Sequence, residues 1–405
     1  MSTISLVLFG ICCLNVCTGQ SSTNLKTLVQ HLFSINGYNK NVRPNSNLTK
    51  PMHVDLDFFL CGINDLSEKT QKLTTTGYLE VIWTDENLIW DNVTYNGISK
   101  IYISQNDIWK PDLALQNGFT KTKEFGENFI NVKIFNNGSV MWYPLEVFET
   151  KCTIDIKYFP FDQQTCEIIF VVWSSSTDVI EMTKGNDGVI LEELEENGVW
   201  TVVSTSASED VQSEESRVTF SLKLERSSSY YVMNVVVPVF LLGILNIFTF
   251  ALPAARGEKM SYSITVYLSF AVFMTIVISE LPKTSGSILG HYLMFQVGLG
   301  AFVVCCTASE LRLHHKKEPV PQKIVQLCRC RKITIKACDS VTNEKEANSE
   351  EVTWEDVISL IDFTFCYVHS YGLTQLMHIV LFIPFLCSWA THYISIVVLL
   401  LNFVS

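Results

Sequence analysis

Six residues between positions 261 and 279 fall on one seam of a predicted helix. They follow one another at steps of four, three, four, three and four residues, which keeps them on one helical face. Most of the six are Ser or Thr, and hydrocarbon offers their hydroxyl groups no hydrogen-bond partner. This face is therefore predicted to meet water or another helix rather than lipid. A seam that only packs against a neighbouring helix is the alternative reading. The six residues are Ser261, Thr265, Leu268, Val272, Thr275 and Ser279.

Charged residues at the inner end of this seam favour contact with water. Glu258 and Lys259 come directly before it. A symmetric ring of such helices would place Glu258 carboxylates at the inner mouth, hydroxyl rings next, and a dry constriction at Leu268 and Val272. Carboxylate rings select cations, and apolar constrictions close a pore by dewetting. The pattern therefore predicts a cation-selective pore helix over 259–279.

This pore helix is one of four predicted membrane spans. The stretches 232–253, 260–279 and 288–311 are each about one bilayer thickness long, and a fourth span falls within 363–404. The segment 312–336 carries eight Lys and Arg residues against one acid, so the positive-inside rule makes it cytoplasmic. This topology places the N-terminal half and the C-terminus outside.

A predicted amphipathic helix leads from the cytoplasmic segment into the last span. Its capping box is Thr353 with Asp356, and apolar residues follow at helical spacing. The chain is accordingly predicted to consist of a signal peptide (1–19), an extracellular domain (20–229), three spans (230–311), a cytoplasmic segment (312–362) and a fourth span with the extracellular C-terminus (363–405).

The N-terminal half carries the marks of an exported domain. An apolar run followed by Thr18 and Gly19 predicts a cleaved signal peptide, with an uncleaved anchor as the alternative. The whole net charge of −12 arises within residues 20–229, because the residues after 229 hold equal numbers of acids and bases. Three Asn-x-Ser/Thr glycosylation sequons lie in the same half, at Asn47, Asn92 and Asn137.

Three cysteines remain in this half once the leader is removed. Cys152 and Cys166 enclose thirteen residues, and closing such a loop stabilises a fold by about 3 kcal/mol. We therefore predict a Cys152–Cys166 disulfide and leave Cys61 as a buried free thiol. The later cysteines fit no zinc pattern, so neither a metal nor a cofactor is predicted.

Residues 50–226 read as short strands with one buried face. Alternation of apolar and polar residues is clear at 53–58, 78–83 and 218–224, and turn residues punctuate it at 136–138 and 185–188. A helical pattern is seen only near 23–33. The predicted fold is an all-antiparallel β-sandwich followed by a four-helix transmembrane bundle.

Several classes of function are excluded by composition and motifs. An acidic chain with pI near 5.2 and no basic stripe is unsuited to nucleic acid. The sequence has no His-Glu-x-x-His, Gly-x-Ser-x-Gly or phosphate loop, so an ectoenzyme is not predicted. An adhesion receptor would explain a glycosylated sandwich, but it needs one span rather than four.

The segment Cys152-Thr-Ile-Asp-Ile-Lys-Tyr158-Phe159-Pro160-Phe161-Asp162 up to Cys166 resembles the signature loop of the Cys-loop pentameric ligand-gated ion channels. The similarity is closest to the nicotinic acetylcholine and serotonin-gated branch. It covers nearly all of residues 25–315 and, more weakly, the last span. Further matching motifs are Trp83-Thr-Asp85-Glu-Asn-Leu88-Ile-Trp90, Trp109-Lys-Pro111-Asp112-Leu113, Asn234-Val-Val-Val-Pro238 and Gly257-Glu258-Lys259-Met260.

The resemblance implies five subunits around a pore in the plasma membrane, with a small-molecule agonist, an amine or a hydrophobic compound, bound between neighbouring extracellular domains. The proline-alanine insertion of the anion-selective branches is absent before Glu258, so cations are the implied permeant ions. Glu68 and Arg226 match the family's charged coupling pair. The tip Phe159-Pro160-Phe161, followed by Asp162, is expected to press on the linker around Pro282.

The implied agonist pocket departs from the family pattern. Trp173 matches the central tryptophan, whose face attracts an ammonium by about 1 to 2 kcal/mol. Tyr78 stands where the neighbouring subunit supplies a tryptophan. Gln116 replaces a box tyrosine, and Glu215 falls where a second capping tyrosine would lie. Met141 and Tyr143 complete the lining from the opposing face.

Three explanations of this altered pocket compete. The chain is a non-principal subunit of a heteropentamer, or a divergent receptor for a ligand other than acetylcholine, as in the chemotactile receptors of this lineage, or acids of the capping loop 203–217 capture an amine ionically. We favour the second, because several box positions have changed together while the gating residues are intact. An acidic loop that is merely solvated is an equally good explanation of those acids.

Overall fold

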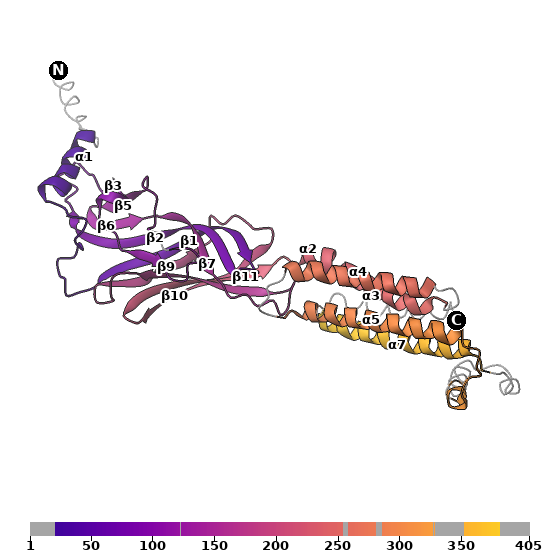
Figure 1. Ribbon diagram of the computed structural model, residues 1–405. Coiled ribbons are helices and arrows are strands. Elements are labelled where there is room, and N and C mark those ends of the chain that lie inside the picture. The colour runs from indigo at the N-terminus through magenta and orange to yellow at the C-terminus, as the bar shows by residue number, and fades with distance from the viewer. Residues whose placement is uncertain are drawn as a thin grey trace, which may run out of the picture. The chain divides into compact units, whose positions relative to one another are not determined.

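The computed structural model describes residues 21–121, 123–253, 258–280, 286–326, 328 and 352–380. Its internal contacts divide the chain into a unit of strands and a unit of helices (Figure 1). Of the described residues, those from 21 to 154 and from 163 to 226 form the strand unit, and residues 155–162 belong with the helices after 226. The predicted signal peptide, Pro282 and the part of the last span after residue 380 lie outside the described residues.

The strand unit is a sandwich of two sheets, as predicted. Its strands are β1 (Met52–Ser67), β2 (Lys72–Ile89), β3 (Lys100–Ser104), β4 (Leu113–Leu115), β5 (Asn131–Phe135), β6 (Asn137–Trp142), β7 (Leu145–Lys151), β8 (Gln163–Val172), β9 (Ile180–Ile190), β10 (Trp200–Gln212) and β11 (Glu215–Arg226). The seven-stranded sheet has the order β3-β5-β6-β2-β1-β9, and β7 also pairs with β2. The four-stranded sheet has the order β10-β11-β8-β4.

Four phenylalanines hold the two sheets together. Phe58 of β1 and Phe148 of β7 come from the larger sheet, and Phe170 of β8 and Phe220 of β11 come from the smaller one. All four are almost fully buried. The Phe58 ring lies 5.6 Å from the rings of both Phe148 and Phe220, and Phe148 meets Phe170 edge-on at 5.4 Å. Strict alternation along the strands places these rings between the sheets.

The prediction of an all-antiparallel sandwich is wrong at one edge, where β9 pairs with β1 in parallel. The residues 185–188, read from the sequence as a turn, lie within β9 at a shift of its register against β1. The buried Asp57 carboxylate accepts a hydrogen bond from the Gly188 backbone N–H at 2.6 Å. A side chain of β1 thus satisfies a backbone donor that regular pairing would have used, so the glycines mark a bulge.

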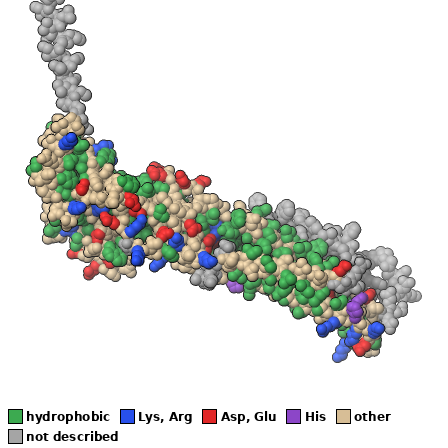
Figure 2. Space-filling view, turned by 45° about the horizontal axis from the view of Figure 1, so that its top comes forward, with side chains coloured by type: hydrophobic (Ala, Val, Ile, Leu, Met, Phe, Trp, Pro, Cys, Tyr) green, Lys and Arg blue, Asp and Glu red, His purple; other side chains and the backbone are tan. Residues whose placement is uncertain are grey.

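Among the residues that the structure describes, three segments of the helical unit are long and apolar enough to cross a membrane: Ser229–Ala251, Glu258–Ser279 and Ile288–His314. They agree with three of the four predicted spans. Figure 2 shows hydrophobic side chains covering the visible face of these helices, whereas charged side chains are scattered over the strand unit. The helices are α2 (Ser229–Tyr231), α3 (Val237–Phe248), α4 (Glu258–Glu280), α5 (Ile288–His314) and α7 (Trp354–Val380), with a π-helix η3 (Val232–Val236) and a 3-10 turn η4 (Thr249–Ala251) around α3.

The predicted capping box of the amphipathic helix is confirmed. The Thr353 backbone N–H donates to the Asp356 carboxylate at 3.0 Å, and the Asp356 N–H donates to the Thr353 hydroxyl at 3.4 Å. The helix α7 then runs without interruption to Val380, into the region predicted for the last span. The predicted N-terminal helix is also present, as α1 (Ser22–Val29) continued by η1 (Gln30–Ile35); η2 (Gln105–Asp107) is a single 3-10 turn.

A buried tyrosine–aspartate pair fixes the loop before β4. The Tyr38 hydroxyl donates to the Asp85 carboxylate at 2.7 Å and accepts the Trp109 backbone N–H at 3.0 Å. Asp85 is fully buried, and this burial raises the pKa of its carboxyl group from 3.8 to about 6. The folded strand unit therefore holds a proton at Asp85 more tightly than the unfolded chain does.

This arrangement predicts a stability that falls as the pH rises from about 4 to about 6. Because the pKa of Asp85 is higher in the folded protein than in the unfolded chain, the protonated carboxyl group stabilises the fold at pH values below its unfolded pKa. This contribution, about 3 kcal/mol at most, is lost as the pH rises past the folded-state pKa. The measurement is the unfolding midpoint of the wild type minus that of Asp85→Asn, taken between pH 4 and 7.5. This difference isolates the contribution of the Asp85 carboxyl group to stability. Tyr38→Phe removes a hydrogen bond that lowers the Asp85 pKa and should shift the loss to higher pH. Parallel profiles for wild type and Asp85→Asn would contradict the assignment.

Candidate functional site

The predicted capping loop is a β-hairpin. The strands β10 and β11 continue to its tip, where Ser213 and Glu214 have φ angles of +55° and +68°. Two successive positive φ angles are the geometry of a type I′ turn, which matches the twist of the flanking strands. Alternation beyond the turn places Glu215 and Arg217 on the same face of β11, with Ser216 and Val218 buried on the other face.

Trp173 stands at the end of β8 with its side chain 62% exposed. Asp112 holds the turn that presents it, because its backbone oxygen accepts the Trp173 N–H at 3.0 Å and its carboxylate accepts the Ser174 N–H at 2.6 Å. Gln116 follows β4 on the same sheet and pairs through its backbone N–H with Ile169 of β8. Three of the six predicted lining residues, Trp173, Gln116 and Glu215, thus belong to the four-stranded sheet.

Arg217, which was not predicted as a site residue, contacts Gln116 and lies two residues after Glu215 on the same face of β11. Its guanidinium forms two hydrogen bonds with the Asp210 carboxylate directly across the hairpin. It also donates to the side-chain oxygens of Gln116, at 3.3 Å, and Gln212. Only 17% of the Arg217 side chain is exposed. The Arg217 guanidinium therefore links Gln116, one of the two positions where the resemblance predicts a box tyrosine, to Asp210 of the hairpin.

The other three predicted lining residues form a second cluster, on the seven-stranded sheet. The Tyr78 ring stacks on Phe59 at 4.6 Å and meets Tyr143 edge-on at 6.1 Å, and the Tyr143 hydroxyl lies 3.5 Å from the Met141 sulfur. Within one chain the six residues thus form two separate groups on different sheets. This is the arrangement expected if each pocket takes one group from each of two neighbouring subunits.

Carboxylates orient both tyrosines of the second cluster. The Tyr78 hydroxyl donates to Glu193 at 3.1 Å, and the Tyr143 hydroxyl donates to Glu80 at 2.5 Å. Burial and the bond to Glu193 raise the pKa of Tyr78 to about 12, and burial with the bond to Glu80 also raises the pKa of Tyr143. Both phenols therefore remain protonated donors at physiological pH.

Cys61 is a free thiol, as predicted, but it is half-buried rather than buried. Its sulfur lies 3.8 Å from the Glu193 carboxylate, which also accepts from Tyr78. Burial and this neighbouring acid raise the pKa of the Cys61 thiol. The described residues contain no group of three or more His, Cys, Asp or Glu side chains placed to hold a metal ion.

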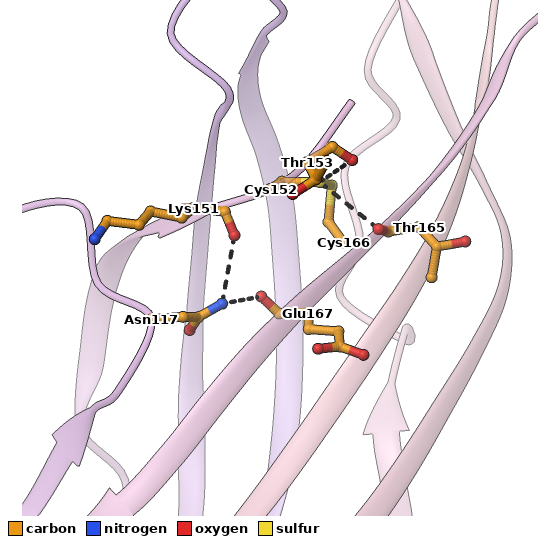
Figure 3. The surroundings of a disulfide bond; sticks show 7 residues. All are labelled: Asn117, Lys151, Cys152, Thr153, Thr165, Cys166 and Glu167. Atoms are coloured by element: carbon orange, nitrogen blue, oxygen red, sulfur yellow. Dashed lines mark hydrogen bonds between the residues drawn. A yellow bond between two sulfur atoms is a disulfide. The ribbon is translucent and has the colours of Figure 1, made fainter. Parts of the chain in front are cut away.

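The predicted disulfide joins Cys152 and Cys166 at the root of the loop between β7 and β8. Figure 3 shows Asn117 beside it, bridging the two strands. The Asn117 amide donates to the Glu167 carbonyl at 2.7 Å and to the Lys151 carbonyl at 3.5 Å, and its oxygen accepts the Ile169 N–H at 3.1 Å. The residue next to Gln116 therefore fixes the base of the disulfide loop.

The tip of this loop packs with the helices. The Phe159 ring meets Tyr231 of α2 at 5.0 Å, and the Lys157 carbonyl accepts the N–H of Ile288, the first residue of α5, at 3.0 Å. Phe159, Pro160 and Asp162 are buried and Phe161 is half-buried. The predicted contact with Pro282 lies outside the described residues, so that part of the coupling path stays a prediction.

The predicted charged pair of Glu68 and Arg226 is formed. The Arg226 guanidinium lies 2.5 Å from the Glu68 carboxylate, with the Arg226 side chain fully buried and that of Glu68 21% exposed. The guanidinium also lies over the Trp200 ring at 4.2 Å. The pair joins the turn after β1 to the last residue of β11, which directly precedes the first membrane span.

Removing the Glu68 carboxylate should be costly because it leaves a buried guanidinium without this counter-charge. We expect Glu68→Gln to lower the free energy of unfolding by about 3 kcal/mol. The matched control is Glu149→Gln, which breaks the more exposed Lys72–Glu149 pair at 2.8 Å and should cost less than about 1 kcal/mol. Thermal unfolding of the purified full chain measures both. Equal costs for the two variants would show that Arg226 does not depend on Glu68.

The residues of the predicted pore seam share one face of α4. Ser261, Thr265, Leu268, Val272, Thr275 and Ser279 are all exposed in the single chain, as is Glu258, whereas Ser263, Val266, Phe270 and Val277 are buried on the opposite face. The hydroxyls of Thr265, Thr275 and Ser279 donate to carbonyls of their own helix at 2.6 to 2.9 Å. Their oxygens remain available as acceptors along the exposed face.

The predicted glycosylation sites lie on the surface of the strand unit. Asn47 and Asn137 are exposed and Asn92 is half-buried. The Asn47 side chain accepts the backbone N–H of Thr49 at 3.0 Å and also its hydroxyl. Glycosylation of these three residues stays a prediction.

Comparison with known proteins identifies both units. Residues 25–228 match the neurotransmitter-gated ion-channel ligand binding domain, and residues 235–375 match the neurotransmitter-gated ion-channel transmembrane region. The acetylcholine receptor subunit beta of Xenopus laevis is 32% identical over 72% of this chain and 63% of its own length. The neuronal acetylcholine receptor subunit beta-4 of Gallus gallus is 31% identical over 71% of this chain and 62% of its own. The acetylcholine receptor subunit beta-like 1 of Drosophila melanogaster is 32% identical over 68% of this chain and 54% of its own.

Proposed function

We propose that this chain, which belongs to the neurotransmitter-gated ion-channel family, is a subunit of a pentameric cation channel in the plasma membrane that opens on binding a small molecule other than acetylcholine. The family consists of ligand-gated ion channels, and its ligand-binding domain faces outward from a membrane-spanning region. The chain spans only about 54 to 63% of the length of the three relatives named above, so its own activity, ligand and partners are part of the proposal.

The observation that carries the channel proposal is the exposed seam of α4. A helix whose Glu258, hydroxyl and leucine positions share one face has the chemistry of a pore lining. The Glu258 carboxylates of five copies would gather at the inner mouth and attract cations. Leu268 and Val272 would form the apolar constriction, which closes when water leaves it.

Neutralising Glu258 should weaken cation selection. We expect Glu258→Gln to move the reversal potential, measured in a sodium chloride gradient, away from the sodium equilibrium potential, because the pore mouth loses one negative charge per subunit. Two-electrode voltage clamp of the full chain measures this. The matched control is Glu318→Gln, which removes an exposed acid paired with Lys316 after α5. If Glu258→Gln left the reversal potential unchanged, Glu258 would not line the pore mouth.

The altered box supports a ligand other than acetylcholine. Trp173 is 62% exposed, but the positions where the family resemblance predicts box tyrosines hold Gln116 and Glu215, and Gln116 bonds to the Arg217 guanidinium. Ionic capture of an amine by the hairpin is also limited, since Asp210 is paired with Arg217 and Glu209 accepts the Lys184 N–H at 2.8 Å. These contacts support the proposal of a divergent, chemosensory-type receptor.

Rebuilding the aromatic box should restore acetylcholine sensitivity. Each added ring that faces an ammonium contributes about 1 kcal/mol, so the double variant Gln116→Tyr with Glu215→Tyr should lower the half-activating acetylcholine concentration at least about tenfold. Glu214→Tyr, which adds a ring at the exposed hairpin tip, serves as the control and should not. A wild-type chain already gated by micromolar acetylcholine would overturn the proposal of a different ligand.

A non-principal role in a heteropentamer is the second candidate, because the three relatives described above are named beta subunits of acetylcholine receptors. In that role the Tyr78 and Tyr143 cluster would complete the pocket of another subunit, and the altered site at this chain's own Trp173 would bind no agonist. Expression of the chain alone separates the two candidates. Agonist-gated current from the single chain supports the homomer, whereas current that needs a co-expressed relative supports the heteromer.

A further inference from the structure

A buried cluster of three charged side chains lies at the first turn of α4. The Lys259 ammonium lies 2.6 Å from the Glu310 carboxylate of α5 and also contacts the Asp362 carboxylate of α7. The exposed fractions of the three side chains are 3% for Lys259, 1% for Glu310 and 16% for Asp362. The Phe250 ring covers the ammonium at 5.8 Å. Three helices and η4 therefore enclose one lysine.

The position of this lysine matters because its neighbour in the chain is Glu258. Glu258 is exposed on the side of α4 that carries the seam, and Lys259 points instead into the helix bundle. If the ammonium lay in the inner mouth, five lysines would cancel the charge of five Glu258 carboxylates. The cluster instead surrounds one positive charge with two negative ones and keeps it out of the mouth.

We propose that Glu310 and Asp362 are positioning residues for ion selectivity: they hold Lys259 away from the pore, so that Glu258 alone sets the charge of the inner mouth. The inference rests on the proposed cation channel. It follows from the cost of an unpaired buried charge. As long as one carboxylate remains, Lys259 keeps a buried partner. When both are neutralised, its ammonium gains by turning to water, which the proposed pore mouth beside Glu258 would offer.

The decisive variant is therefore the double substitution Glu310→Gln with Asp362→Asn, because a single substitution still leaves Lys259 one carboxylate. We expect its single-channel sodium conductance at low ionic strength to fall roughly twofold or more, since the mouth no longer concentrates cations, and its reversal potential to move toward that of chloride. Adding Lys259→Met to the double variant should restore both. Glu318→Gln, which alters only an exposed pair, should change neither.

Leu268→Ser serves as the common background of all these channels. A hydroxyl at the constriction favours wetting, so current flows without the unidentified agonist. The charge swap Lys259→Glu with Glu310→Lys is the complementary variant. It preserves the buried pair and should leave the conductance unchanged, whereas a rise in cation conductance would place position 259 in the mouth and overturn the inference.

Thermal unfolding of the solubilised full-chain proteins provides a readout that needs no current. The double variant should unfold at a lower temperature than the triple variant, in which Lys259→Met removes the unpaired charge. Equal unfolding midpoints, or a conductance that the third substitution fails to restore, would overturn the inference. A Leu268→Ser channel whose reversal potential follows the chloride gradient, or that conducts no current, would count against the proposed cation channel. In that case the unfolding midpoints of the double and triple variants would test the positioning of Lys259 by themselves.

Discussion

The disulfide between Cys152 and Cys166 constrains the one loop that belongs to both units of the chain. Its ends continue from β7 and into β8, whereas residues 155–162 pack with the helices. The covalent bond holds the two ends of the loop together at the edge of the strand unit. β8 also presents Trp173 at its far end, so one strand connects the open aromatic face with the loop that contacts Tyr231 and Ile288.

Local patterns predicted the parts of the fold that depend on local interactions. Alternation along β2 and β11 gave the buried face of each sheet, the spacing of the apolar spans gave the helices, and Thr353 with Asp356 gave the start of α7. The parallel pairing of β9 with β1 could not be predicted in this way, because it joins residues more than a hundred positions apart. The glycines at 185 and 188 resembled a turn, since no sequence pattern reveals that Asp57 satisfies the Gly188 N–H.

The candidate site was predicted residue by residue, but its connections were not. Tyr78 and Trp173 were placed through the family resemblance, yet Tyr78 is oriented by Glu193, which lies 115 positions further along the chain. Arg217 carried a local signal, since strand alternation puts it beside Glu215, but its bond to Gln116 spans 101 positions. Lys259 and Asp362 are 103 positions apart and meet only because α4 and α7 pack together. These contacts are long-range hydrogen bonds and ion pairs, which composition and periodicity do not reveal.

The same arrangement recurs in both units: a basic side chain is buried beside an acid at a place where a free positive charge would interfere. Arg217 is paired with Asp210 in the β10–β11 hairpin, Arg226 with Glu68 before the first span, and Lys259 with two acids next to Glu258 in the chain. The field of a close ion pair falls off faster with distance than that of a single charge, and salt screens what remains beyond about 8 Å. A ligand at Trp173 or a cation at Glu258 would therefore meet mainly the groups left exposed. In this chain the basic residues Arg217 and Lys259 are paired with neighbouring acids, so under the proposed function Glu258 would be the dominant charge at the pore mouth.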